Sequence, residues 1–340
     1  MTATTQKRRA DAGPPKLPQR RTRARGFSLS GMAWLVWRQH RAAFLLLLAA
    51  AAVATAGLAW LARDANSAVA AVGGAKASPI AEAALNSAYQ RLGLAGMALT
   101  GLPVIIGVFI GAPLFAGDLE SGTAKFVGVQ SYGRWNWVAI KLGMAAVFAV
   151  VAALSSGIAM KALWTPLVNH SAVNADFTSA GGFDTMGPVA VTLAVLGLLI
   201  GAAAGLLMRR TLPAMVVTFG TLLAVKTVFS QLRMMFATTV TKTTADGRFG
   251  DDDYPTVPAN ALSIDTSYIT RDGSLRGWGT CANADDRAAC LRRDGVVGWS
   301  TEYLPFSHMG AMQWAATGAL AALVLLMAGV LVYAARRALR

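Results

Sequence analysis

The residues able to do chemistry are few in this chain of 340 residues, and they are scattered. Ser155 and Ser156 lie in an apolar run with no histidine or carboxylate nearby in the sequence, and serines in such runs commonly hydrogen-bond to their own backbone. The two cysteines and three histidines lack the spacing of a metal site. A GxxxxGKS or GxxxxGKT phosphate-binding loop is absent from the sequence. We therefore expect no catalytic, cofactor-binding or metal-binding residues in this chain.

The cysteines Cys281 and Cys290 both fall in the largest polar segment, residues 231–310. If that segment lies outside the cell, the oxidising environment favours a disulfide that closes a short loop. Two free thiols are the alternative.

Lys226 is the ionisable residue that lies deepest in an apolar run. A lysine side chain can extend along its helix to the membrane surface, so we expect Lys226 to reach the outer boundary, with contact to a transported substrate as the alternative. The apolar runs hold no aspartate or glutamate at depth. This composition argues against a carrier driven by protons or sodium ions.

The elements that must position these residues are apolar runs. Hydrophobic residues make up 55% of the chain and charged residues 14%. The runs are about twenty residues long, enough for a helix to cross the roughly 30 Å hydrocarbon core of a membrane. We predict an all-α polytopic membrane protein with six transmembrane helices and a small extracytoplasmic domain at 231–310, between spans five and six. The predicted spans are 42–62, 92–116, 139–160, 187–208, 212–230 and 311–335.

The formal net charge of +14 comes largely from the segment before the first apolar run. Basic segments of this kind stay in the cytoplasm, so residues 1–26 are predicted to be a disordered cytoplasmic tail. The tail can touch anionic membrane lipid, and no nucleic-acid partner is expected. Six crossings return the arginine-rich carboxyl terminus to the same side, while the acidic 161–186 segment is expected outside. The first apolar run is too long for the core of a cleaved signal peptide.

Residues 27–41 are predicted to form an interfacial connector helix before span one. Trp34 and Trp37 suit the polar boundary of a membrane, and Arg38 follows them. A simple extension of span one is the alternative. The other predicted divisions are spans one to five at 42–230, and span six with a cytoplasmic tail at 311–340.

Glycines at helix-packing spacing mark span four. Gly197, Gly201 and Gly205 recur at every fourth position and would let another helix approach closely. Packing within one subunit is the favoured interpretation, and a subunit interface is the alternative. In span two, Pro103 is expected to kink the helix or to open its hydrogen bonding.

The segment that follows span two is the most specialised part of the sequence. Residues 111–123 read as a short amphipathic element on the cytoplasmic side, with Asp118 and Glu120 near its start, where carboxylates complement a helix dipole. An ordinary loop between two spans is the alternative.

Several short motifs extend this interpretation. They are Gly-x-Phe-x-Gly-Ala-Pro-Leu at 107–114, Leu-Glu-x-Gly-Thr at 119–123, Gln-Ser at 130–131, Arg-Trp at 134–135 with Lys141, and Trp-Arg-Gln-His-Arg at 37–41. Together with the six-span layout, they resemble permeases of type-2 ATP-binding-cassette exporters, in particular actinobacterial ones. The resemblance implies a coupling element that sits in a groove of the ATPase and contains Asp118, Glu120, Gly122 and Thr123.

The resemblance also implies the partners. A separate ATPase, present in two copies, would hold ATP and magnesium, and a second permease, identical or homologous, would complete the complex. The expected location is the plasma membrane, with multiple crossings and both termini in the cytoplasm. The expected function is export of a hydrophobic or amphipathic compound such as a drug, an antibiotic or a lipid. A non-transporting sensor or scaffold, whose outer domain binds a ligand or a protein, is the alternative.

Overall fold

The computed structural model of the protein describes residues 31–73, 78–122, 133–168, 176–248, 253, 255–258 and 260–338. Within these ranges, six helical segments are long and apolar enough to cross a membrane, which confirms the six-span membrane class. In chain order, the spans consist of α1 (Met32–Val72), α2 to α4 (Pro79–Glu120), α6 (Arg134–Val168), α8 (Gly187–Met208), α9 with η2 (Thr211–Phe236) and η3 with α11 (Phe306–Ala338).

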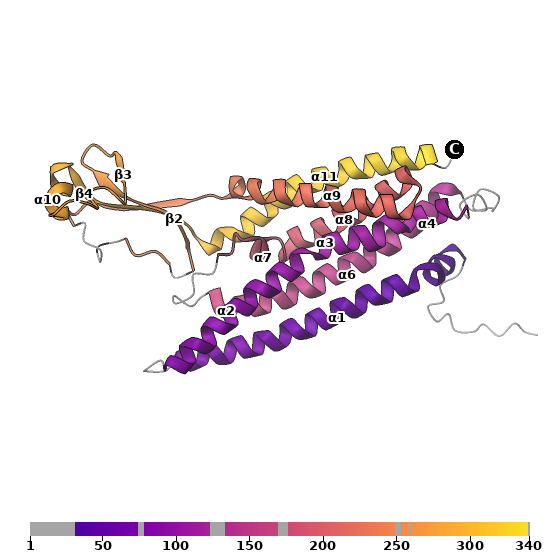
Figure 1. Cartoon of the computed structure of the whole chain (residues 1–340), viewed down its shortest axis with the longest axis horizontal. Coiled ribbons are helices and arrows are strands. Elements are labelled where there is room, and N and C mark those ends of the chain that lie inside the picture. The colour runs from indigo at the N-terminus through magenta and orange to yellow at the C-terminus, as the bar shows by residue number, and fades with distance from the viewer. Residues whose placement is uncertain are drawn as a thin grey trace, which may run out of the picture.

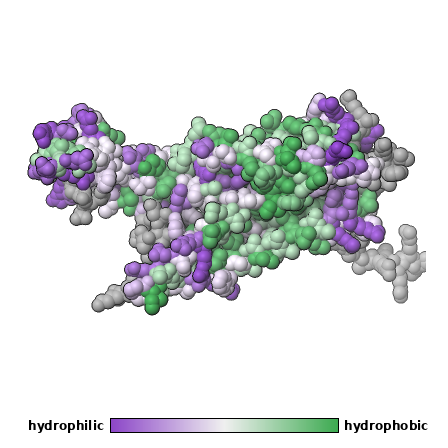
Figure 2. All heavy atoms as spheres, in the orientation of Figure 1, coloured by the Kyte–Doolittle hydropathy of each residue, from purple (hydrophilic) through white to green (hydrophobic). Residues whose placement is uncertain are grey.

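Helix α8 is the centre of the bundle. In its most apolar stretch, 83% of the residues are buried. In the corresponding stretches of the other five spans, between 17% and 33% of the residues are buried. α8 packs against α4, α6, α9 and α11, and α1 packs on the far side of α6 (Figure 1). The apolar surface of the helices separates a polar end from the polar outer domain (Figure 2). The exposed faces of the other spans are therefore apolar because they contact lipid.

Helix α1 is longer than the membrane requires. It contains 41 residues, about 60 Å at a helical rise of about 1.5 Å per residue. Residues 32–41, expected as part of a connector, form the first turns of this continuous helix. Residues 1–30, which include the predicted tail, lie outside the described residues.

The second span is divided into four pieces. α2 (Pro79–Thr100) is followed by α3 (Leu102–Ile105), the π-helical η1 (Ile106–Gly111) and α4 (Ala112–Glu120). Pro103 lies in the first turn of α3, directly after the end of α2. This position agrees with the local break that was expected at this proline.

The three glycines of α8 lie against this divided span in the same subunit. A Cβ atom added at Gly197, Gly201 or Gly205 would collide with the backbone oxygens of Pro103, Gly107 and Ala112, respectively. The absence of side chains at these positions therefore lets the backbones of spans two and four touch.

The segment before α8 folds back into the bundle. The short helix α7 (Ala180–Phe183) lies here, and Phe177, Phe183 and Met186 are almost completely buried. Gln313 of α11 donates a hydrogen bond to the backbone oxygen of Met186 at 3.1 Å. The expectation that all of 161–186 is an external segment is therefore wrong for its last residues, because they bury aromatic side chains between the spans.

An ion cluster anchors this re-entrant segment. The carboxylate of Asp184 lies 3.1 Å from Nζ of Lys226 and 4.0 Å from Nη1 of Arg233. Arg233 also donates to the backbone oxygen of Thr178 at 2.6 Å. The Lys226 side chain is 17% exposed. The prediction that Lys226 extends to the surface holds only in small part, because its ammonium group pairs with Asp184.

The outer domain is built on a four-stranded antiparallel sheet with the order β1-β4-β2-β3. Tyr268 of β2 and Trp299 of β4 form its core with their rings 4.2 Å apart. The strands are β1 (Val240–Thr244), β2 (Leu262–Thr270), β3 (Leu275–Gly277) and β4 (Val296–Leu304), with α10 (Arg287–Arg293) before β4.

A disulfide closes the segment around α10. The sulfur atoms of Cys281 and Cys290 are joined, with their Cα atoms 6.0 Å apart. Asp294 lies close to the two sulfurs. Because each sulfur is bonded to the other, neither is a thiolate available to a metal ion.

Candidate coupling site

Asp118 lies at the end of α4 and joins three helices. Its carboxylate forms an ion pair with Lys141 of α6 and accepts a hydrogen bond from the Gln39 side chain of α1. Nζ of Lys141 also donates to the backbone oxygen of Leu114 in α4, at 2.9 Å. We call Gln39, Asp118 and Lys141 the inner junction.

The inner junction is enclosed by aromatic rings. Lys141 is fully buried, and its Nζ lies 5.0 Å from the ring centre of Trp137 and 5.9 Å from that of Phe115. Asp118 is 7% exposed. A buried cation is stable only when its charge is compensated, and here the carboxylate, a carbonyl oxygen and two ring faces do so.

These positions correct the expectation for the two acids. Asp118 and Glu120 lie at the end of α4, so they do not complement the dipole of their own helix. Asp118 also points inward, where it is shielded from a partner protein. It can act on the coupling element only by holding α4 against α1 and α6.

Glu120 is exposed and binds the beginning of another span. Its carboxylate accepts hydrogen bonds from the backbone nitrogen of Thr211, at 2.9 Å, and from the Thr211 hydroxyl, at 2.8 Å. Thr211 is the first residue of α9, so the carboxylate satisfies a backbone N–H at a helix start and meets the positive end of that dipole. Glu120 thus connects the inner ends of spans two and five.

Gly122 ends the described part of this segment. Its φ of 73° is in the left-handed region, which glycine adopts readily and which commonly terminates a helix. A Cβ atom there would have no neighbour within 4 Å, so the turn projects away from the bundle. Thr123, the fourth predicted coupling residue, lies outside the described residues, as do Gln130 and Ser131.

The predicted connector residues divide between two surfaces of α1. Trp34 and Arg38 are exposed, with the guanidinium carbon of Arg38 at 5.2 Å from the Trp34 ring centre. Trp37 instead packs on α6, where its ring lies 5.9 Å from that of Phe148. The start of α1 is therefore fixed to α6 by Trp37 and to α4 by Gln39.

The sequence motifs agree with a comparison across known families. A model of the ABC-2 membrane transporter related family matches residues 28–233. The chain belongs to this family. The match contains α1 to α9 and therefore every residue of the inner junction, together with Glu120 and Thr211. No curated protein and no solved structure matches the chain.

Sequence reasoning identified the segment but missed its partners. Gln39 and Lys141 were quoted only within motifs, and Thr211 was not singled out. Lys141 carried a usable signal, because a lysine near the start of an apolar span needs a compensating group, and an acid precedes it by 23 residues. Nothing local relates Glu120 to Thr211, which is 91 residues away.

Proposed function

We propose that the protein is the permease subunit of an exporter that is driven by a separate ATPase and moves a hydrophobic or amphipathic compound, such as a drug, an antibiotic or a lipid. Membership of the ABC-2 family supports the permease role and an ATPase partner. The ATPase would be present in two copies and would bind the ATP and magnesium.

The position of the coupling site carries this proposal. The exposed Glu120 and the Gly122 turn lie beside the buried junction of α1, α4 and α6. A displacement of the turn would move α4, and the inner junction would pass that movement to α1 and α6. Glu120 would pass it to α9 through Thr211.

A second permease, identical or homologous, is part of the proposal. Helix α8 fills the centre of one subunit, and its glycines bring it into backbone contact with span two. We therefore place the path of the cargo between two permeases. The inner junction is assigned to the cytoplasmic face of the plasma membrane, in agreement with the arginines at both ends of the chain.

Charge reversal at Glu120 tests the coupling role. We expect Glu120→Lys to reach the membrane at near-normal levels but to lose ATPase association or cargo-stimulated ATP hydrolysis. Glu82→Lys is the matched control, because Glu82 is an exposed carboxylate in the first turn of α2 at the opposite end of the bundle. If Glu120→Lys retains both association and stimulated hydrolysis, Glu120 is not part of the ATPase contact.

Two further variants separate the charge of Glu120 from its bonds to α9. Glu120→Gln keeps a hydrogen-bond acceptor and removes the charge, whereas Thr211→Ala removes a bonding partner and keeps the charge. If the carboxylate contacts the ATPase, Glu120→Gln will weaken association more than Thr211→Ala. The reverse order would assign Glu120 to the internal α4 to α9 contact alone.

The orientation and the alternative function are tested separately. A cysteine introduced at Ser121 should resist a membrane-impermeant reagent added to intact cells, and one at Ser263 in β2 should react; the opposite pattern would invert the topology. An ATPase that copurifies, but whose hydrolysis no cargo stimulates, would favour the sensor or scaffold.

A further inference from the structure

A basic surface lies at the inner end of the bundle, where the turn between α8 and α9 meets the end of α11 (Figure 1). Arg209 and Arg210 form this two-residue turn, and Arg336 and Arg337 lie in the last turn of α11. All four residues are exposed. Nη2 of Arg209 donates to the backbone oxygen of Arg337 at 3.2 Å, so the turn and α11 are in direct contact. We call these four arginines the basic surface.

Acids of the same chain do not balance the charge of the basic surface. Within the part of the chain that the structure describes, no ion pair joins any of the four arginines to a carboxylate. Glu120, which reaches this turn, already accepts two hydrogen bonds from Thr211. Asp118 is buried in the inner junction. The adjoining sequence 123–132 contains no aspartate or glutamate. Four cations therefore face one exposed carboxylate.

Arg209 has a backbone conformation that glycine usually adopts. It is the C-cap of α8, and its φ of 55° lies in the left-handed region. Glycine is the common residue at such helix ends, because a side chain there is strained. Helix termination alone therefore does not account for an arginine at this position. The residue adds a cation to the basic surface, and its side chain connects the turn to α11.

Apolar residues adjoin the turn on both sides. Leu207 and Met208, at the end of α8, are each 42% exposed, and Leu212, in the first turn of α9, is 75% exposed. Such exposed apolar side chains on membrane-spanning helices contact acyl chains. The turn therefore lies at the boundary between the hydrocarbon core and the lipid headgroups. Because the turn has two residues, its long guanidinium side chains lie at the level of the lipid phosphates.

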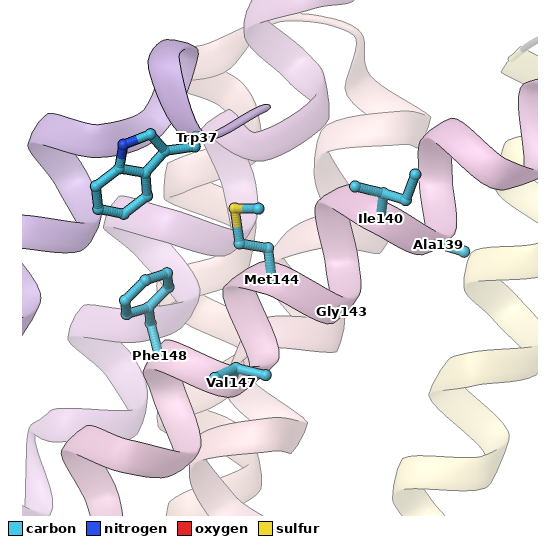
Figure 3. Close-up of a pocket in the computed structure, with 7 residues that line it drawn as sticks. All are labelled: Trp37, Ala139, Ile140, Gly143, Met144, Val147 and Phe148. Atoms are coloured by element: carbon cyan, nitrogen blue, oxygen red, sulfur yellow. The ribbon is translucent and has the colours of Figure 1, made fainter. Parts of the chain in front are cut away.

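The apolar groove between α1 and α6 provides a contrast. It has a volume of about 480 Å³, and its lining, which includes Trp37, Gly143 and Phe148, contains no charged residue (Figure 3). A hydrocarbon chain could lie in such a groove, but the lining cannot distinguish one lipid headgroup from another. The basic surface has the charge that this distinction requires.

We propose that the basic surface binds the headgroup of an anionic phospholipid. A planar guanidinium group donates two parallel hydrogen bonds to phosphate oxygens, and clusters of arginines at a membrane surface recognise anionic lipids. The phosphate reduces the repulsion among the four cations and links the α8 to α9 turn to α11 more firmly. Lipid binding is a property of the permease alone, so it can be tested whether or not the proposed exporter function holds.

Native mass spectrometry of the purified full-length protein tests the site. The probes are dioleoyl phosphatidylglycerol and dioleoyl phosphatidylcholine, which share their acyl chains and differ in headgroup charge. We expect the wild-type protein to retain phosphatidylglycerol preferentially. Each of Arg210→Gln and Arg336→Gln should lower that affinity about fivefold, the equivalent of about 1 kcal/mol for one basic side chain at the membrane surface. Arg271→Gln should leave it unchanged, since Arg271 is exposed in the outer domain and its loss alters the net charge equally.

Arg209→Gly separates lipid binding from folding. Glycine adopts the left-handed conformation without strain, so the lipid-free variant should unfold at about the wild-type temperature. Its affinity for phosphatidylglycerol should nevertheless fall about fivefold. Arg209→Lys keeps the charge and should retain most of the affinity. A purely structural role of the Arg209 side chain would instead lower the unfolding temperature of Arg209→Gly and leave its lipid preference intact.

Gly143→Leu tests whether the lipid lies in the groove between α1 and α6 instead. A Cβ atom at Gly143 would have no neighbour within 4 Å, so the variant narrows the groove without disturbing the fold. The preference for phosphatidylglycerol should remain. If Gly143→Leu removes this preference and the arginine variants do not, the lipid lies in the groove.

Three further outcomes would overturn the assignment. Equal retention of the two lipids by the wild-type protein would remove the headgroup site. Displacement of the lipid by an equal concentration of soluble glycerophosphoglycerol would show a site for free phosphate compounds. If the arginine variants keep phosphatidylglycerol but lose a copurifying ATPase, the basic surface belongs to the contact with that protein.

Discussion

The inner junction and the Asp184 cluster are both buried ion clusters, at opposite ends of the bundle, but their charges balance differently. The inner junction pairs one carboxylate with one fully buried lysine. The outer cluster shares the Asp184 carboxylate between Lys226 and Arg233, and the Lys226 side chain is 17% exposed. The first arrangement is neutral and its lysine is fully buried, whereas the second has an excess cation and its lysine is partly exposed.

This difference indicates how firmly each end is held. Removing Lys141 leaves the Asp118 carboxylate, whose side chain is 9% exposed, without its cation, which is strongly destabilising. Removing a member of the outer cluster leaves either a second cation or a group that can rehydrate. We therefore expect the inner ends of α1, α4 and α6 to remain together, and the outer ends to tolerate rearrangement.

Lys141→Met is expected to give the largest effect. It leaves the Asp118 carboxylate buried without its cation, and should lower the free energy of unfolding by about 3–5 kcal/mol. The double variant Lys141→Met/Asp118→Leu should recover most of this loss, because a buried ion pair can be replaced by apolar side chains at little cost. Denaturant unfolding in detergent measures both; equal instability of the single and double variants would contradict the closed pair.

Asp184→Asn should produce an intermediate effect, about 1–3 kcal/mol, because charge-assisted hydrogen bonds and ion pairs to Lys226 and Arg233 are lost. Asp64→Asn is the control, since Asp64 pairs with Arg91 on the surface with both side chains more than 40% exposed, and exposed pairs contribute about 0–1 kcal/mol. Thermal unfolding of the two variants side by side gives the comparison. A similar shift for both would mean that the outer cluster is effectively solvated.

Lys226→Met allows a direct comparison of the two clusters, because Lys141→Met makes the same substitution in the inner junction. We expect a loss of about 1 kcal/mol or less, since Arg233 remains beside Asp184 and the lysine was already partly hydrated. The ratio of the two effects is the informative quantity. If Lys226→Met is as damaging as Lys141→Met, the two ends of the bundle are equally closed.

The smallest effect is expected for Asp272 in the outer domain, because its carboxylate is exposed. It serves as a reference for the two buried clusters. Hydrogen bonds from Thr270 and Ser274 hold the pKa of Asp272 below its ordinary value. Its stabilising contribution is therefore complete above the unfolded-state pKa of about 3.9 and is lost as the pH falls through the lower folded-state pKa. On acidification, the amides of the β2 to β3 turn in the wild-type protein should lose protection from hydrogen exchange, compared with the amides of the rest of the domain. In Asp272→Asn, this relative change should be absent.

The positions of the membrane spans could be predicted from the sequence, because hydrophobicity determines them. The 187–208 span coincides with α8. The 92–116 span runs across α2, α3, η1 and α4, and the other four predicted spans lie within longer helices, because the hydrophobic signal reports the membrane core and not the polar helix ends. Helix ends that project into water, such as both ends of α1, carry too little apolar character to be assigned.

Contacts between residues that are far apart in the sequence could not be predicted from hydrophobicity. The contact of Glu120 with Thr211 depends on the packing of span five beside span two. The burial of Asp184 depends on aromatic residues that carry the acidic segment inward, although its charge alone indicated an external loop. The fold of the outer domain was left open, since β1 pairs with β4 across 54 or more residues of intervening sequence, as between Thr244 and Trp299.

The sheet order has a mechanical consequence. β1 follows the end of span five, β4 leads into span six, and the two strands are direct neighbours from Val240 with Tyr303 to Thr244 with Trp299. The outer ends of α9 and α11 are therefore clamped by one antiparallel ribbon, with strands about 4.8 Å apart. The domain projects far beyond the helices (Figure 1). A slight tilt of α9 and α11 would therefore give a larger displacement at the tip of the domain, which a fluorophore near the exposed Trp278 would report.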